Sequence, residues 1–401
     1  MKQLSFKHIV TNVLLLSLLI SVFSYPKMAR AENNGLAVSV GMDYGDDVDT
    51  TEDAKDASSA YSEAGYSTDT LTSPVKSSFT ETRLQAEILF FSGHANPNLM
   101  SFDSFYIYCN SGSSSDNVNL WNTASYQKLI TFAGCNTAGG DSKKNGGGGS
   151  STDCITKRAV DQGADVAVGW TTTVSAGSHT NWLRRYNNAL AEGYTVSGAI
   201  NKANSYIYLP GSGVKNVQYY GDGDVVITSS KSTKTVAPSN TFILTNENNA
   251  VIVNDIIYNV LENNGYFNTN NYTAYASETN NGYTIDVYYK CNGILTNVAI
   301  TIQLNAKKNI TDINTYNFPA ASLDNIPSAL QSEAPQIAAQ TFKTQTLALE
   351  LNRINQFEKV AKQTQYEYYD ITNKTTYLIT YTETVDDYGA KYVYENCIEI
   401  Q

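Results

Sequence analysis

The stretch LITFAGCNTAGG, residues 129–140, is the part of the sequence from which the fold is predicted. It is a short apolar run that ends in a single thiol, Cys135, set among small residues. A buried strand that gives way to a glycine-rich turn is typical of the carboxyl edge of a parallel sheet, where ligands bind. A cysteine there is either a nucleophile or an inert buried thiol, since free cysteine commonly behaves as a small hydrophobe.

Five further runs read as strands that alternate with helix-like segments. The strand candidates are LAVSVGMDY (36–44), YSTDTLT (66–72), AEILFFSG (86–93), ADVAVGWTTTV (164–174) and NVQYYGDGDVVI (216–227). Helical spacing of apolar residues indicates helices within 47–65 and within 178–206. This alternation predicts an α/β fold with a mostly parallel sheet flanked by helices, followed by a smaller α+β C-terminal domain.

The domain boundaries follow from changes in composition. Residues 1–31 have the basic start, apolar run and small-residue cleavage site of a signal peptide, so we expect a secreted, extracellular protein. We place the main domain at 35–228, a polar linker at 229–240 and an accessory domain at 241–401, which comprises two helix-plus-hairpin units. The second unit begins near Glu333.

Charge and hydropathy exclude two classes of partner. Loss of residues 1–31 removes four of the 27 basic residues and no acidic ones, so the formal charge of −11 becomes −15. A chain this acidic is not expected to bind nucleic acid. Beyond the signal peptide there is no run of about 18 apolar residues, so we predict no membrane span in the mature chain.

The five cysteines cannot all pair within one chain, which favours at least one free thiol. Cys291 with Cys397 and Cys109 with Cys154 are both conceivable disulfides, and the sequence does not decide between pairing and free thiols.

Two histidines remain after the signal peptide, and one of them matches Cys135 in position. His94 follows the strand AEILFFSG as Cys135 follows LITFAG, so we expect the two at neighbouring strand ends. A histidine can ionise a thiol and later protonate a leaving amine. The backbone amides of Ala95 and Cys135 are candidate donors to an oxyanion. His179, at the start of a predicted helix, is interpreted as a surface or capping residue.

The sequence resembles the caspase-like (clan CD) cysteine peptidases in four motifs that occur in this order: FFSGHAN, TFAGCNTAGG, DVAVGWTTTVSA and YYGDGDVVI. The motif around Cys135 is most similar in sequence to CHAT-type domains. The resemblance covers residues 35–227 and implies an endopeptidase with a Cys135 nucleophile and a His94 base that acts through a thioester. Relatives place glycine directly after the histidine and alanine before the cysteine, whereas this chain has Ala95 and Gly134. The C-terminal region resembles PepSY-like modules.

The resemblance also implies where a substrate side chain binds. The pocket for the P1 residue would be formed by Gly169, Trp170, Thr171, Thr172 and the loop to Ala176, which carries no charge. An acidic pocket residue would have to come from elsewhere, with Asp141, Asp153 and Asp222 as candidates. The glycine-rich loop 141–151 contains Lys143 and Lys144, a candidate processing site, although a plain surface loop is the simpler interpretation.

No cofactor or metal is predicted. The GDGD sequence at 221–224 has two carboxylates that would suit calcium, but such a glycine turn is more often only a turn.

The sequence therefore favours a secreted cysteine endopeptidase that acts on a protein or peptide substrate and whose thiol alkylates faster than a model thiol. The alternative is a non-catalytic extracellular binding module that retains a peptidase fold, for which the 29 tyrosines would supply contact area. A third hypothesis is that the protein is a precursor whose catalytic domain cleaves only itself or one partner. The P1 preference, natural substrate, oligomeric state and role of the C-terminal domain are not predicted.

Overall fold

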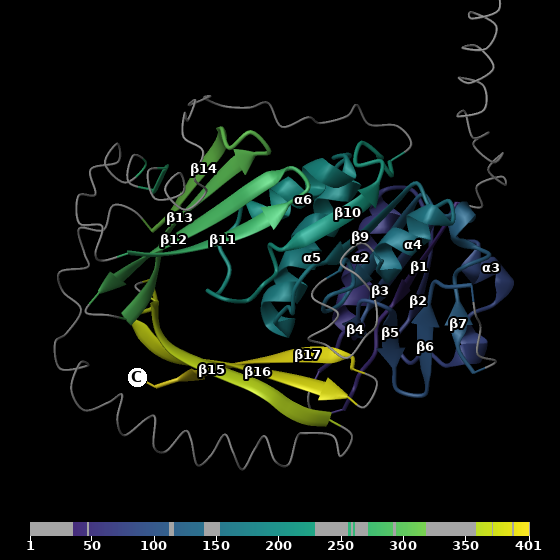
Figure 1. Cartoon of the computed structure of the whole chain (residues 1–401), viewed down its shortest axis with the longest axis horizontal. Coiled ribbons are helices and arrows are strands. Elements are labelled where there is room, and N and C mark those ends of the chain that lie inside the picture. Colours follow the sequence, from purple (N-terminus) through teal and green to yellow (C-terminus); the bar gives the residue numbers. More distant parts are fainter. Residues whose placement is uncertain are drawn as a thin grey trace, which may run out of the picture. The chain divides into compact units, whose positions relative to one another are not determined.

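The computed structural model describes residues 35–45, 48–111, 116–139, 153–228, 256–257, 260, 272–291, 294–317, 358–370, 372–386 and 389–400. Its first sheet has six strands in the order β10-β9-β8-β3-β1-β2 (Figure 1). The strands are β1 (Leu36–Val40), β2 (Ser67–Leu71), β3 (Ile88–Ser92), β8 (Leu129–Ala133), β9 (Val166–Trp170) and β10 (Val217–Gly221). All neighbours are parallel except β10, which runs antiparallel to β9. The predicted α/β fold with a mostly parallel sheet is confirmed.

Both faces of this sheet are buried, which explains the continuous apolar strands. In β3, Ile88 and Phe90 belong to one core cluster while Leu89 and Phe91 belong to another, as the two-residue period of a strand requires. Residues of α2 (Thr51–Glu63), α5 (Ala176–Ala191) and α6 (Val196–Asn204) pack in the first cluster, and residues of α4 (Ile155–Asp161) in the second. Helices therefore flank the sheet on both sides.

The segment 178–206, predicted as helical, is divided between α5 and α6. Gly193 has a φ of +90° between them, a left-handed conformation that ends a helix and that glycine adopts without steric strain. Further short helices in the described part of the chain are α3 (Glu81–Leu84), η1 (Lys76–Ser78) and η2 (Ala124–Tyr126).

A second, larger sheet joins the C-terminal region to a set of short strands inserted after β3. The inserted strands are β4 (His94–Asn96), β5 (Leu99–Phe102), β6 (Phe105–Tyr108) and β7 (Val118–Asn119). The C-terminal strands are β11 (Tyr272–Thr279), β12 (Gly282–Cys291), β13 (Ile294–Asn305), β14 (Ile310–Tyr316), β15 (Glu358–Asp370), β16 (Thr375–Asp386) and β17 (Lys391–Glu399). A single antiparallel pair, Lys391 with Ala95, links β17 to β4.

The predicted hairpins of the accessory region correspond to β12 with β13 and to β16 with β17. Of the first predicted helix, Ile256, Ile257 and Val260 are described and helical. The second predicted helix, from about Glu333, and the signal peptide lie outside the described residues, as do Lys143 and Lys144.

Neither conceivable disulfide is present, because Cys109, Cys154 and Cys397 are all free thiols. Cys397 lies in β17 and Cys291 ends β12, and three strands separate these two in the sheet. At about 4.8 Å between neighbouring strands, β12 and β17 lie roughly 19 Å apart, far beyond the reach of a disulfide. The sulfur of Cys154 caps α4 instead, accepting the Lys157 N–H at 3.4 Å.

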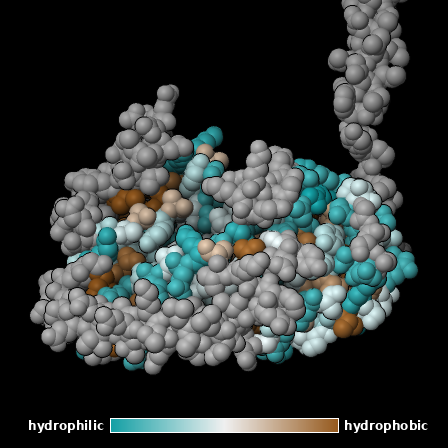
Figure 2. Space-filling model, turned by 60° about the horizontal axis from the view of Figure 1, so that its bottom comes forward, coloured by the Kyte–Doolittle hydropathy of each residue, from teal (hydrophilic) through white to brown (hydrophobic). Residues whose placement is uncertain are grey.

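The face seen in Figure 2 is largely hydrophilic over the described residues, and its hydrophobic side chains form small separate patches. Among the described residues, the exposed large hydrophobic side chains are Val75, Tyr275 and Ile313. Within the residues that the structure describes, no helix has the length and apolar character needed to span a bilayer.

Candidate functional site

The loops that carry His94 and Cys135 touch through their backbones. β3 and β8 are adjacent and parallel, with Ser92 opposite Ala133, so the two loops leave the sheet at the same edge. The N–H of Gly93 donates to the Ala133 carbonyl at 3.2 Å. A Cβ added at Gly134 would lie 2.7 Å from the Gly93 oxygen, so there is no room for a side chain. His94 and Cys135 each follow directly after this glycine contact.

The turn that presents Cys135 is held firmly to β9. Asn136 has a φ of +60°, a left-handed conformation that asparagine tolerates better than most residues. Its N–H donates to the Thr172 carbonyl at 3.0 Å. The Thr137 hydroxyl lies 2.8 Å from the Phe132 carbonyl and accepts the Trp170 N–H at 3.1 Å. These bonds fix the backbone on the carboxyl side of the thiol.

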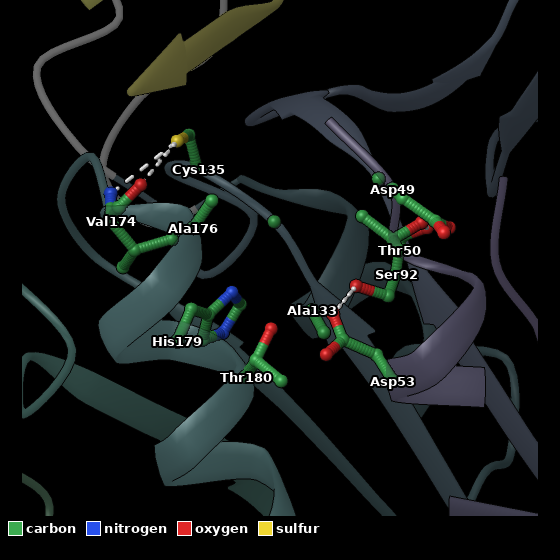
Figure 3. Close-up of a pocket in the computed structure, with 12 residues that line it drawn as sticks. Asp49, Thr50, Asp53, Ser92, Ala133, Cys135, Val174, Ala176, His179 and Thr180 are labelled. Atoms are coloured by element: carbon green, nitrogen blue, oxygen red, sulfur yellow. Dashed lines mark hydrogen bonds between the residues drawn. The ribbon is translucent and has the colours of Figure 1, made fainter. Parts of the chain in front are cut away.

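The thiol itself is turned toward the segment after β9. Figure 3 shows Sγ of Cys135 directed at the backbone of Val174, whose N–H donates to the sulfur at 3.4 Å and whose carbonyl lies 3.8 Å from it. Cys135 is only 2% exposed. Burial raises the pKa of its thiol to about 12, because the thiolate would lose its hydration. In this conformation the thiol is protonated.

His94 opens β4 and is also buried. Its ring packs edge-on against Tyr44 with the centroids 4.6 Å apart, and the backbone N–H of His94 donates to the Tyr44 hydroxyl at 3.4 Å. That hydroxyl donates to the Ser101 carbonyl at 2.7 Å, so Tyr44 ties the histidine to β5. Burial lowers the pKa of His94 to about 3, and the imidazole is therefore neutral.

A cavity of about 20 Å³ lies between Cys135 and α5, and it is lined by a second histidine (Figure 3). His179 is buried, and its Nε2 has no hydrogen-bond partner. The interpretation of His179 as a surface or capping residue is therefore wrong. It lies three residues before the buried Trp182 on the same helical face, a spacing that signals burial.

Asp53 of α2 faces the same cavity. Its Oδ2 accepts the Ser92 hydroxyl at 2.7 Å, whereas its Oδ1 is buried without a partner. Burial is the main cause that raises the pKa of Asp53 to about 6. Asp53 and His179 both line this cavity.

The residues expected to form a substrate pocket have different environments. A Cβ at Gly169 would lie 2.5 Å from Thr156 Oγ1, and Trp170 is fully buried with its indole N–H bonded to the Val214 carbonyl at 2.8 Å. Both therefore pack inside the domain. The Thr171 N–H donates to the Asn216 carbonyl at 2.9 Å. Thr172 borders a cavity of about 250 Å³. Substrate contact by these residues stays a prediction.

Of the acidic candidates, Asp153 and Asp222 lie among the described residues, and each has a partner of its own. Asp153 pairs with Arg158 at 2.6 Å, and Asp222 accepts the Asp224 N–H at 3.0 Å as part of a turn. Among the described residues, no group of three metal-binding side chains comes together. Asp141 lies outside them.

The C-terminal strand β17 contacts two segments of the site, the one that follows His94 and the one that follows Val174. Lys391 pairs with Ala95, next to His94, and Val393 forms an isolated parallel bridge with Ser175, next to Val174. Lys391 also influences the thiol electrostatically. A faded-yellow C-terminal strand is visible beside Cys135 in Figure 3. None of this was evident from the sequence.

The solved structures to which this chain is similar include two of one cysteine proteinase. The crystal structure of the Arg-specific cysteine proteinase gingipain R (RgpB) is 10% identical and covers 90% of this chain, with a TM-score of 0.33. The complex of the pro- and mature domains of RgpB from Porphyromonas gingivalis is 11% identical and covers 72%, with the same TM-score. The matches span 66% and 63% of those chains. A likeness this distant assigns no activity and no residue role.

No protein-family model matches the chain, and no curated protein matches it. The resemblances to CHAT-type and PepSY-like domains therefore stay predictions from the sequence.

Proposed function

We propose that the protein is a secreted cysteine endopeptidase in which Cys135 is the nucleophile and His94 the general base. The observation that supports the proposal is the close backbone contact between Gly93 and Gly134, the residues directly before His94 and Cys135, at the carboxyl edge of two adjacent parallel strands. This edge is where open α/β sheets bind their ligands.

In the proposed reaction, the Cys135 thiol gives its proton to the imidazole of His94, and the thiolate attacks the carbonyl carbon of the scissile peptide bond. The backbone N–H groups of Ala95 and Cys135 are candidates to stabilise the oxyanion. The amine leaves with the proton from His94, and a thioester remains. Water then attacks the thioester carbonyl and gives a proton to His94. The C–S bond breaks, the carboxylic acid product leaves, and the proton returns from His94 to the sulfur of Cys135.

The test is hydrolysis of a fluorogenic peptide library varied at P1 by residues 32–401, compared with Cys135→Ala and His94→Ala. Cys154→Ala is a matched control, because it removes a buried thiol that lies at the start of α4. We expect turnover to be lost in the first two variants and kept in the control. Turnover that survives Cys135→Ala would refute the proposal.

One observation favours a second candidate, a non-catalytic extracellular binding module. Cys135 is buried and protonated, and burial holds the neighbouring His94 neutral. If neither full-length protein nor a form with an exposed thiol hydrolyses any library peptide, the binding module becomes the better account.

A further inference from the structure

The strand β17 meets the site in the manner of an extended peptide. Its residues Lys391 and Val393 pair with Ala95 and Ser175, and these two partners belong to separate segments, one beside His94 and one beside Val174. Two residues of a strand span about 6.6 Å, so one short stretch of β17 crosses from one wall of the site to the other. Addition of a strand to exposed backbone edges is a common mode of peptide recognition.

A carboxylate of β17 is bound specifically at the start of α5. Oε2 of Glu395 accepts the hydroxyl of Ser175 at 2.6 Å and the hydroxyl of Ser178 at 2.9 Å. A Cβ at Gly177 would lie 3.1 Å from Oε1 of Glu395, so this carboxylate also packs closely on the backbone of the first turn. The N-terminus of a long helix favours a negative charge, and hydrogen bonds to a charged acceptor are strong.

A third contact stiffens the strand where it passes the thiol. Lys391 pairs with Glu383 of β16 at 2.7 Å, and both side chains are mostly buried. Both also act electrostatically on Cys135. The β16–β17 hairpin thus contributes charged groups near the thiol while its backbone pairs with the surrounding loops.

From these contacts we infer that the surface formed by Ala95, Ser175 and the first turn of α5 binds an extended peptide with an acidic side chain, and that β17 is its internal occupant. The inference rests on the proposed function, because it assigns that surface to the substrate. Residues 389–400 keep substrate out and shield Cys135 until β17 is displaced.

The test weakens β17 by one isosteric change in the full chain. Glu395→Gln keeps the size of the side chain and removes its charge, and Glu399→Gln makes the same change at an exposed position of the same strand. The readout is the rate of Cys135 alkylation by iodoacetamide, measured by peptide mass spectrometry. We expect Glu395→Gln to accelerate labelling about tenfold and Glu399→Gln to match the unmodified protein.

Two further measurements separate displacement of β17 from a general loss of structure. Cys109 and Cys154 are buried thiols outside the β16–β17 hairpin, so they should stay unlabelled in Glu395→Gln. The pair Ser175→Ala with Ser178→Ala removes the same hydrogen bonds from the other side, and adding it to Glu395→Gln should give no further acceleration. A synthetic peptide of residues 389–400 should slow labelling of Glu395→Gln, and the same peptide with glutamine at 395 should do so less.

The inference is overturned if Glu395→Gln and Glu399→Gln label Cys135 at the same rate, or if Cys109 and Cys154 label together with it. Alkylation needs no turnover, so its outcome is independent of the peptidase assay. Faster labelling without hydrolysis of any peptide would support the occupied surface and refute the proposed function. Hydrolysis without any change in labelling would do the reverse.

Discussion

Removal of Lys215 should test whether the C-terminal sheet packs on the α/β part in solution. Lys215 precedes β10, and its Nζ lies 2.6 Å from Oδ1 of Asp286 in β12. The two side chains are 4% and 10% exposed, and the Thr301 hydroxyl donates to the same carboxylate oxygen at 2.7 Å. In Lys215→Met, Asp286 keeps one hydroxyl partner and loses its counter-charge. A buried charge stranded in this way destabilises a protein by about 3–5 kcal/mol.

Removal of the other partner, in Asp286→Asn, should lower stability by less than Lys215→Met does, and by an amount that depends on pH. Burial already lowers the pKa of Lys215, so in Asp286→Asn the unpaired amine can lose its proton and become neutral. Its pKa is then lower in the folded than in the unfolded protein, and stability should rise with pH up to the unfolded value near 10.4. The double variant should be more stable than the sum of the two single effects predicts, by about 2 kcal/mol or more.

The assay is equilibrium unfolding in urea, followed by tryptophan fluorescence and by far-UV circular dichroism. The matched control is Lys55→Met, which breaks a pair with Glu52 that is more than half exposed on both sides, and it should leave the unfolding curve unchanged. If Lys215→Met shifts the curve no more than this control does, Lys215 and Asp286 are not buried together, and the packing of β12 against the α/β part is refuted.

Three further predictions concern the site. Gly134→Ala should destabilise the fold by about 1–3 kcal/mol in urea unfolding, because its Cβ would lie 2.6 Å from that of Ala95 and 2.7 Å from the Gly93 oxygen; unchanged stability would contradict the backbone contact. The pKa of Asp53 is raised from 3.8 to about 6, so between these pH values the carboxyl is protonated in the folded protein and ionised in the unfolded chain. The free energy of unfolding should therefore fall by roughly 3 kcal/mol as pH rises through this range. Asp53→Asn should remove this pH dependence, and a variant whose profile runs parallel to that of the unmodified protein would refute the prediction. The pKa of His179 is lowered to about 3, so between pH 3 and 6.5 the imidazole is neutral in the folded protein and protonated in the unfolded chain. The free energy of unfolding should therefore fall by up to about 5 kcal/mol as pH drops from 6.5 to 3. His179→Phe should weaken this loss of stability in acid, measured by thermal unfolding.

The sheet was predictable because its strands carry their own signal. Runs such as residues 88–92 and 129–133 are apolar on both faces, and only a strand covered on both sides has that pattern. The positions of His94 and Cys135 at neighbouring strand ends followed from the same reasoning. The turn after each strand also had the small residues that a close backbone contact requires.

The surroundings of the thiol were not predictable, because they depend on contacts distant in sequence. The bridge between Ser175 and Val393 joins residues more than 200 positions apart, and an alternating strand pattern does not reveal its partner. The burial of His179 could have been predicted, because its spacing from Trp182 places it on the buried face of the helix, but it was interpreted as a surface or capping residue. The sequence also did not show why Gly134 stands where relatives have alanine, whereas the structure leaves no space for a Cβ there.

One physical cause accounts for both unfavourable pKa values at the site, and this reconciles the buried thiol with catalysis. Proton transfer from a thiol of pKa about 12 to an imidazole of pKa about 3 costs on the order of 12 kcal/mol, which would make Cys135 inert. Burial is the largest cause of each shift, and it acts in opposite directions on an acid and a base. Rehydration of the site would therefore lower the pKa of Cys135 and raise that of His94 together. With the reference values of about 8.5 and 6.5 the same transfer costs roughly 3 kcal/mol, within reach of a peptidase. Displacement of β17 would thus both admit substrate and make the thiolate accessible.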